Sequence, residues 1–226
     1  VNAMKQQYDV PVGVKIAGTD YIEYELAVIA KTQADYIVID GAEGGTSHSN
    51  PTLQDNVGLP TLHTLVRTVD WLEEQGIRNR FSVIVAGGLT TPGHFLKAKA
   101  LGADAVYIGS IALMAALQSQ VVKATPQAPP VQLAVYDGKL TDKLDIDKAA
   151  QHLANFLNSC TAEMQLAVQA VGKAAFSELN RDDLVTVDKN LAEFIGIRYA
   201  GSPRRQAANQ QQDRRSSSTQ DTIQLQ

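Results

Sequence analysis

The stretch FSVIVAGGLTTPGHFLKAKALGADAVYIGS, residues Phe81–Ser110, decides the fold. It holds two apolar runs rich in β-branched residues, and each run leads into a glycine-containing turn. Between the runs, Thr91 and Pro92 are typical of a helix start, because threonine caps a helix and proline fits its first turn. The pattern predicts a strand–helix–strand unit, with a further helix beginning directly after the second strand.

The same strand-then-helix pattern fills most of residues 10–120. The apolar runs are continuous rather than alternating, which is typical of a parallel sheet covered on both faces. Helical spacings fill the intervals between them, as over residues 62–72. The order βαβαβαβα predicts right-handed crossovers and a parallel sheet. The four runs are Val10–Gly18, Ala34–Gly41, Phe81–Gly88 and Ala103–Ser110.

The glycine turns distinguish between two folds that have this order of strands and helices. A doubly wound fold is expected to carry a Gly-x-Gly-x-x-Gly turn after one strand, and the sequence has none. In a (β/α)8 barrel the phosphate site follows the last two strands, beside a helix N-terminus. The turns AGGLTTPG and IGS suit such a cradle, because glycine lets backbone N–H groups approach a ligand closely. We predict the C-terminal half of a (β/α)8 TIM-type barrel, followed by C-terminal helices and a disordered tail.

A half-barrel leaves two sheet edges open. We therefore expect the missing N-terminal strands to lie upstream in the full protein, or two half-barrels to pair as a homo-oligomer. The chain begins at Val1, and we expect it to be a fragment. We divide it into the barrel half (1–120), a proline-rich connection with a helical extension (121–200) and a disordered polar tail (201–226). The extension is predicted to hold an amphipathic helix over 149–171 and another beginning at Asn180.

Composition narrows the class of protein. The net charge of −4 gives no electrostatic attraction for nucleic acid, so a nucleic-acid-binding protein is not indicated. The single cysteine, Cys160, falls on the apolar stripe of its helix, which favours a place in the core over reactivity. No apolar run approaches the ~18 residues of a membrane span, and no signal peptide is visible. We expect a cytoplasmic protein without a metal site, and the missing N-terminus leaves an upstream anchor open.

A few polar residues stand where barrel enzymes carry their chemistry. Lys15 lies near the C-terminal end of an apolar strand, so it either faces the anionic part of a ligand or snorkels to the rim. Asp40 and Glu43, in the loop after the second strand, bind substrate, steer a neighbouring lysine or are solvated. His48 and His94 are expected to be exposed or structural.

Several motifs together resemble the FMN-binding domain of the glutamate synthase family. They are VKIAG, IDGAEGGTSHSNP, VGLPTL and GGLTTPGHFLKAKALGADAVYIGSIAL, in that order along the chain. The resemblance covers about Pro11–Leu117 and extends through residues 144–172, as in the shorter, stand-alone members. It implies a TIM-type barrel that holds FMN at the C-terminal ends of its strands. It also implies reductive chemistry, in which 2-oxoglutarate and ammonia give glutamate with hydride from reduced FMN.

The resemblance assigns roles residue by residue. Lys15 matches the strand lysine near the flavin pyrimidine edge, where a cation stabilises the negative charge of reduction. We take Lys15 and Glu43 as the catalytic candidates. The residues expected to bind the cofactor are Lys15, Gly44, Gly45, Thr46, Gly87, Gly88, Gly109 and Ser110.

The sequence departs from the family pattern in three ways. The region after the fourth predicted strand lacks the cysteines of the full glutamate synthases, so no iron–sulfur cluster is expected. No glutaminase domain is present, so ammonia, free or glutamine-derived, comes from elsewhere. Ser47 and His48 replace the usual Gly-Ala after Gly-Gly-Thr. Electrons are expected from NAD(P)H or a donor protein.

Three alternatives stay open. An α-hydroxy-acid oxidase carries a His-Gly-Gly-Arg loop, but Glu43 and Thr46 stand at the equivalent positions. A flavin-binding remnant without an electron supply is a non-catalytic alternative, motivated by the absent cysteines. A barrel that binds a phosphorylated sugar or nucleotide through the same glycine turns is the third.

Overall fold

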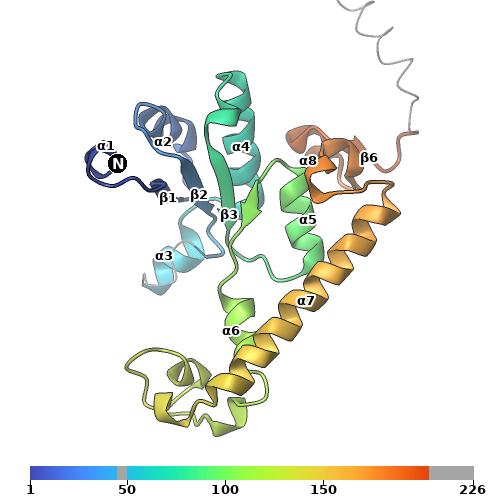
Figure 1. Cartoon of the computed structure of the whole chain (residues 1–226). Helices are drawn as coiled ribbons and strands as arrows, with labels where there is room; N and C mark the ends of the chain where they lie inside the picture. Colours follow the sequence, from blue (N-terminus) through green and yellow to red (C-terminus); the bar gives the residue numbers. More distant parts are fainter. Residues whose placement is uncertain (45–49, 204–226) are drawn as a thin grey trace, which may run out of the picture. The chain divides into compact units, whose positions relative to one another are not determined.

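A four-stranded parallel sheet forms the centre of the structure. The computed structural model describes residues 1–44 and 50–203. The strands lie side by side in chain order, and Figure 1 shows them in the upper part of the molecule. This arrangement confirms the predicted parallel βα half-barrel. The strands are β1 (Gly13–Ala17), β2 (Tyr36–Asp40), β3 (Ser82–Ala86) and β4 (Ala105–Val106).

Helices follow each strand, as the sequence pattern predicts. The N-terminus of α5 forms as expected, because the Thr91 side chain accepts a hydrogen bond from the His94 N–H and Pro92 occupies the first turn. Two short helices were not predicted, α1 (Asn2–Gln7) and α3 (Pro51–Asn56). The helices that follow the strands are α2 (Ile22–Ile29), α4 (Thr61–Glu74), α5 (Pro92–Ala100) and α6 (Ser110–Leu117).

The two faces of the sheet carry different side chains. Side chains two positions apart on a strand share a face. The face that packs against α4 is apolar and fully buried, and it is formed by Ile37, Ile39, Val83 and Val85. On the opposite face Lys15, Val38 and Ile84 lie in one row across three strands. The next row toward the C-terminal ends of the strands is Ala17, Asp40 and Ala86.

The sheet has two open edges. Among the described residues, β1 pairs only with β2, and β4 pairs only with β3. A closed barrel has no such edges. The described part of the chain is therefore half of a barrel, as predicted.

A compact lobe follows the half-barrel. We call residues 118–145 the 118–145 lobe; its turns are 3-10 helices at Val121–Lys123, Pro130–Leu133 and Thr141–Lys143. Its core is centred on the fully buried Leu133. The buried Gln120 side chain closes the lobe, because its amide donates to the Asp145 carbonyl and accepts from the Asp145 N–H, at 2.9 and 2.8 Å.

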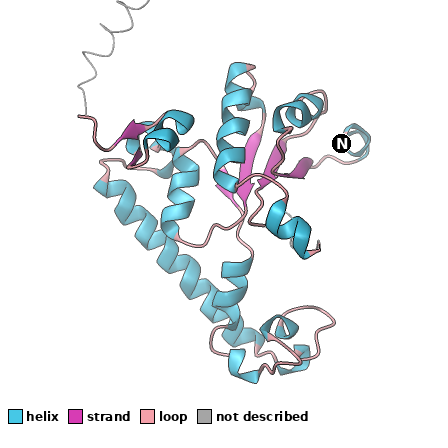
Figure 2. Ribbon diagram, turned by 180° about the vertical axis from the view of Figure 1, so that it is seen from behind, coloured by secondary structure: helices cyan, strands magenta, loops and turns pink. Residues whose placement is uncertain are grey.

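The long helix α7 (Ile146–Ala170) returns from the lobe toward α5. Figure 2 shows it as one unbroken helix, with the lobe at one end. Its extent agrees with the predicted amphipathic helix, and Cys160 is buried on it, as expected. Within residues 1–44 and 50–203, no helix combines the length and apolar character needed to cross a membrane.

The helix predicted to begin at Asn180 is wrong. The structure has a single 3-10 turn at Arg181–Asp183, which begins as a helix would: the Asn180 N–H donates to Asp183 Oδ2, and the Asn180 side chain accepts from the Asp182 N–H. The turn does not continue as a helix, because the segment just beyond it, Val185–Thr186, forms a strand. β-branched residues such as these favour a strand over a helix.

The chain groups into two compact units, Val1–Asp183 and one that begins at Leu184. In the second unit, β5 (Val185–Thr186) pairs with β6 (Arg198–Tyr199), and Asp188 caps the intervening helix α8 (Lys189–Ile195). The boundaries at residues 120 and 200 stay a prediction. The expected disordered tail lies largely outside the described residues.

Candidate functional site

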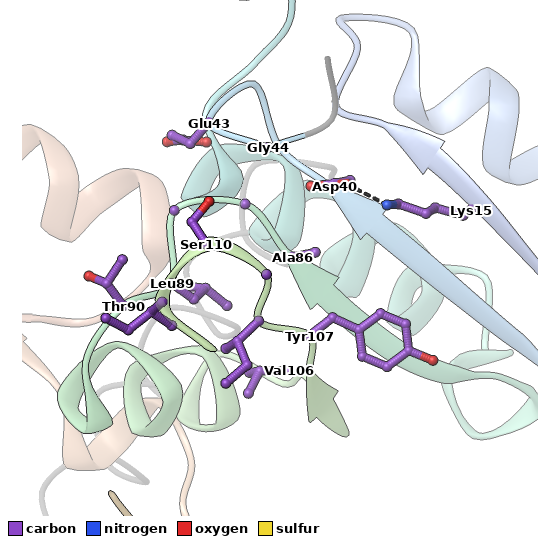
Figure 3. A pocket seen from close by; sticks show the side chains of 15 residues that line it. Lys15, Asp40, Glu43, Gly44, Ala86, Leu89, Thr90, Val106, Tyr107 and Ser110 are labelled. Atoms are coloured by element: carbon purple, nitrogen blue, oxygen red, sulfur yellow. Dashed lines mark ion pairs between the residues drawn. The ribbon is translucent and has the colours of Figure 1, made fainter. Parts of the chain in front are cut away.

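A pocket of about 770 Å³ lies at the C-terminal ends of the strands. A volume of this size is typical of a site for a small molecule or cofactor. Figure 3 shows the side chains around it, contributed by all four strands and by the turns that follow β2, β3 and β4. Its lining includes Lys15, Asp40, Glu43, Gly87, Gly88 and Gly109.

Lys15 and Asp40 form an ion pair in this pocket. Lys15 Nζ lies 2.6 Å from Asp40 Oδ2, and Figure 3 marks the pair with a dashed line. Lys15 projects from the middle of β1, whereas Asp40 is the last residue of β2. Lys15 is in register with Val38, two residues before Asp40 on β2. The two side chains therefore lie in adjacent rows on the same face of the sheet, and the lysine side chain reaches the carboxylate.

Glu43 is held by the N-terminus of α4. The backbone N–H of Thr61 donates to Glu43 Oε2 at 2.8 Å, and the Thr61 hydroxyl lies 2.7 Å from the same oxygen. A carboxylate at a helix N-terminus is favoured by the helix dipole and satisfies a free N–H group. The Thr61 hydroxyl also lies 2.9 Å from the Gly87 carbonyl oxygen. Thr61 therefore joins the loop after β2 to the turn after β3.

The turn after β3 depends on glycine. Gly87 and Gly88 have φ angles of +107° and +66°, a region that residues with a side chain rarely adopt. A Cβ on Gly87 would also collide with the Thr61 hydroxyl. The predicted need for glycine at this turn follows from both facts.

The N-terminus of α6 opens on the pocket without a side-chain cap. Among the described residues, the N–H groups of Gly109 and Ser110 meet no acceptor. Gly109 has no neighbouring atom within 4 Å of the place where a Cβ would stand, so the backbone there is open to a ligand. Free N–H groups at a helix N-terminus are a ready site for an anion such as phosphate.

The structure brings most of the predicted site residues together. Lys15, Glu43, Gly44, Gly87, Gly88, Gly109 and Ser110 all line the one pocket. Gly45, Thr46 and His48 lie outside the described residues. His94 does not line this pocket, but its Nδ1 accepts from the N–H of Thr90, which does, at 3.3 Å.

Sequence reasoning missed Thr61. The motif VGLPTL offered one signal, a threonine directly after a proline at a helix start. The contacts of Thr61 with Glu43 and Gly87 cross between loops, so no local pattern revealed them. In the described ranges, no group of three or more His, Cys, Asp or Glu side chains is placed to hold a metal ion.

Comparison with known proteins settles the family. Residues 1–174 match the family described as "Conserved region in glutamate synthase". The chain belongs to the glutamate synthase family. Its relatives include the archaeal-type glutamate synthase [NADPH] of Thermotoga neapolitana, 36% identical over 86% of this chain and 39% of that protein. The archaeal glutamate synthase [NADPH] of Archaeoglobus fulgidus is 34% identical over 89% of this chain and 40% of its own length.

A third relative, the glutamate synthase large subunit-like protein of Rhizobium meliloti, is 31% identical over 86% of this chain and 48% of that protein. The chain thus spans less than half the length of these family members.

Solved structures agree on the fold. The Arg289Lys variant of flavocytochrome b2 matches with a TM-score of 0.52 and 20% identity, over 92% of this chain and 42% of that one. The recombinant flavin-binding domain of flavocytochrome b2 from baker's yeast matches with a TM-score of 0.50 and 19% identity, over 92% and 42%. At this identity the likeness establishes the fold, the C-terminal half of a TIM-type barrel.

The residues around the pocket fit FMN. At one end, the free N–H groups of Gly109 and Ser110 suit a phosphate. At the other end, the partly exposed ammonium of Lys15 suits the edge of a ring that gains negative charge on reduction. The pocket spans both ends.

Proposed function

We propose that the full protein is an FMN-dependent oxidoreductase that forms glutamate from 2-oxoglutarate and ammonia. The observation that supports this proposal is the meeting of Lys15 with the glycine turns after β3 and β4 in one pocket, in a chain of the glutamate synthase family. FMN, when bound, supplies hydride-transfer chemistry. The chain's own residues hold the cofactor and shape its surroundings.

The phosphate-binding role falls to the two glycine turns. Gly87 and Gly88 let the turn after β3 adopt positive φ angles at the pocket, and Gly109 and Ser110 present N–H groups. Lys15 is the residue that stabilises negative charge on the ring. Gly44 lines the pocket in the loop after β2, and the family resemblance assigns Gly45 and Thr46 to the cofactor as well.

Glu43 has a positioning role in this proposal. Its Oε2 is bonded to Thr61, so it fixes the loop after β2 against α4. This engagement also weighs against the α-hydroxy-acid oxidase alternative, whose reacting histidine stands at the equivalent position and must be free to take a proton.

The partners of the chain follow from its open edges. We propose that β1 and β4 pair with strands from outside this sequence, because each edge offers unpaired N–H and C=O groups. NADPH, which the relatives' names specify, is the proposed electron source. The single cysteine leaves this chain without the thiolates of an iron–sulfur cluster.

The test begins with the full-length protein, purified and supplied with FMN. We expect absorption bands at about 375 and 450 nm, the usual positions for oxidised flavin. Under anaerobic conditions NADPH should bleach these bands, and 2-oxoglutarate with ammonium should restore them while glutamate accumulates. Omission of ammonium is the matched control, and it should leave the bands bleached.

Each contrary outcome has a definite meaning. A protein that takes up no FMN refutes the oxidoreductase and favours a phosphate-binding barrel. Bound FMN that neither NADPH nor a reduced ferredoxin bleaches favours the non-catalytic remnant. If the reduced FMN is reoxidised by a 2-keto acid alone, the product of a hydroxy-acid oxidase, but not by 2-oxoglutarate with ammonium, glutamate formation is refuted.

A further inference from the structure

Asp40 is the buried charge in the pocket whose role the proposed function leaves open. We propose that Asp40 is a positioning residue that holds the Lys15 ammonium at the pocket wall and offsets its positive charge, and so lowers the reduction potential of FMN. The inference rests on the proposed function, since it assigns a role in tuning the same cofactor.

The exposures of the two side chains are unequal. The Lys15 side chain is 59% exposed, whereas the Asp40 side chain is 6% exposed. The carboxylate therefore lies beneath the lysine and has little access to water. A lysine on the open side of a pocket would ordinarily sample many rotamers. With its Nζ held 2.6 Å from Oδ2, it stays at one place on the wall.

The second oxygen of Asp40 has no partner. Asp40 Oδ1 is buried and meets no hydrogen-bond donor among the described residues. A buried carboxylate with a bare oxygen costs stability, because the lost hydration is not replaced. A pair that served stability alone would be expected to satisfy both oxygens. The retained cost points to a function for the negative charge at this position.

Gly44 makes room for this arrangement. A Cβ on Gly44 would lie 2.7 Å from Asp40 Oδ1, closer than such atoms approach one another. Any larger residue at position 44 would displace the carboxylate. The glycine that the family resemblance assigns to the cofactor loop thus also shelters the Asp40 charge.

The electrostatic consequence has a definite sign. A cation beside the ring favours the reduced, negatively charged form, and so raises the reduction potential. A carboxylate 2.6 Å behind that cation cancels part of its field. Removal of the Asp40 charge should therefore raise the potential of FMN, and removal of the Lys15 charge should lower it.

The test compares Asp40→Asn with wild type in the FMN-loaded full-length protein. Asparagine keeps the shape of aspartate and removes its charge. We expect the reduction potential to shift positive and the affinity for sulfite, which adds to electron-poor flavins, to rise about tenfold, the order of magnitude for a unit charge removed near a ligand. Lys15→Met should shift both quantities in the opposite direction.

A matched control removes the same charge outside the pocket. Asp20 follows β1 at the same end of the sheet, and its side chain is 81% exposed. Asp20→Asn should leave the potential unchanged. An Asp40→Asn shift no larger than that of Asp20→Asn, in protein with FMN bound, overturns the proposal.

A second measurement does not need the cofactor. In FMN-free full-length protein, an uncharged acylating reagent should label Lys15 more slowly than the exposed Lys31, because the contact with Asp40 must open first. Equal labelling rates would show that Asp40 does not hold the lysine and would overturn the proposal even if Asp40→Asn fails to fold. Slow labelling in a protein that takes up no FMN would refute the proposed function and the tuning of FMN, and leave Asp40 with its positioning role only.

Discussion

Thr61 connects the two loops that form the pocket, so its hydroxyl is the most informative group to remove. Thr61→Val keeps the shape of the side chain and deletes the oxygen that contacts Glu43 Oε2 and the Gly87 carbonyl, at 2.7 and 2.9 Å. Thr61 is buried, with 6% of its surface exposed, so water does not replace the lost contact. We expect a cost of about 1–3 kcal/mol, the penalty for unsatisfied buried polar groups.

The assay measures stability and cofactor affinity in the full-length protein. Urea unfolding gives the free energy of unfolding, and quenching of FMN fluorescence gives the dissociation constant. We expect the dissociation constant to rise about tenfold for each 1.4 kcal/mol of distortion that binding must reverse.

Thr61→Ser is the matched variant. It keeps the hydroxyl and loses one methyl group, worth about 0.8 kcal/mol, so stability should fall slightly while FMN affinity stays at the wild-type value. The reasoning is refuted if Thr61→Val binds FMN as tightly as wild type, or if Thr61→Ser weakens binding as much as Thr61→Val does.

Three further predictions concern groups away from the pocket. Burial raises the pKa of the Cys160 thiol, so a thiol reagent at pH 8 should react only as the protein unfolds; fast labelling of the native protein would contradict this. The hydrogen bond from Arg67 lowers the pKa of Glu23 below its usual 4.5, so the carboxylate stabilises the fold above about pH 4.5 and this contribution is lost as the pH falls through the lowered pKa. Glu23→Gln should thus reduce the melting temperature at pH 7 and have little effect near pH 3. An equal effect at both pH values would show that the ionised Glu23 does not stabilise the fold through Arg67. Gln120→Ala removes both bonds to the Asp145 backbone, so limited proteolysis should cut the 118–145 lobe faster than in wild type, while unchanged cleavage would show that the lobe is closed without this side chain.

Local patterns predicted the elements that local physics forms. The spacing of Leu65, Val69 and Leu72 predicted α4, and these residues are buried on it. The Thr91-Pro92 pair predicted the start of α5. The helix expected from Asn180 starts with its cap but goes no further than one turn, because the segment just beyond it forms β5 and pairs with β6 instead. The short helix α3 was not predicted, because six residues are too few to show a helical periodicity.

Pairings across the sheet were beyond local reasoning. Asp40 ends β2 and Glu43 follows it, and the sequence left both open as substrate ligands, partners of a lysine or solvated acids. The structure separates them: Asp40 turns to Lys15, and Glu43 turns to Thr61. Strand register decides the first contact, and the approach of α4 to the loop decides the second.

By itself, the sequence determined the order of strands and helices, the positions of the glycine turns and the resemblance to a family, because periodicity, turn chemistry and motifs are properties of neighbouring residues. Only the tertiary structure decided which charges meet, which oxygen of Asp40 is left bare and which loops Thr61 joins. These contacts join residues that are distant along the chain, and they exist only once parallel strands and the helices on them have packed in one register.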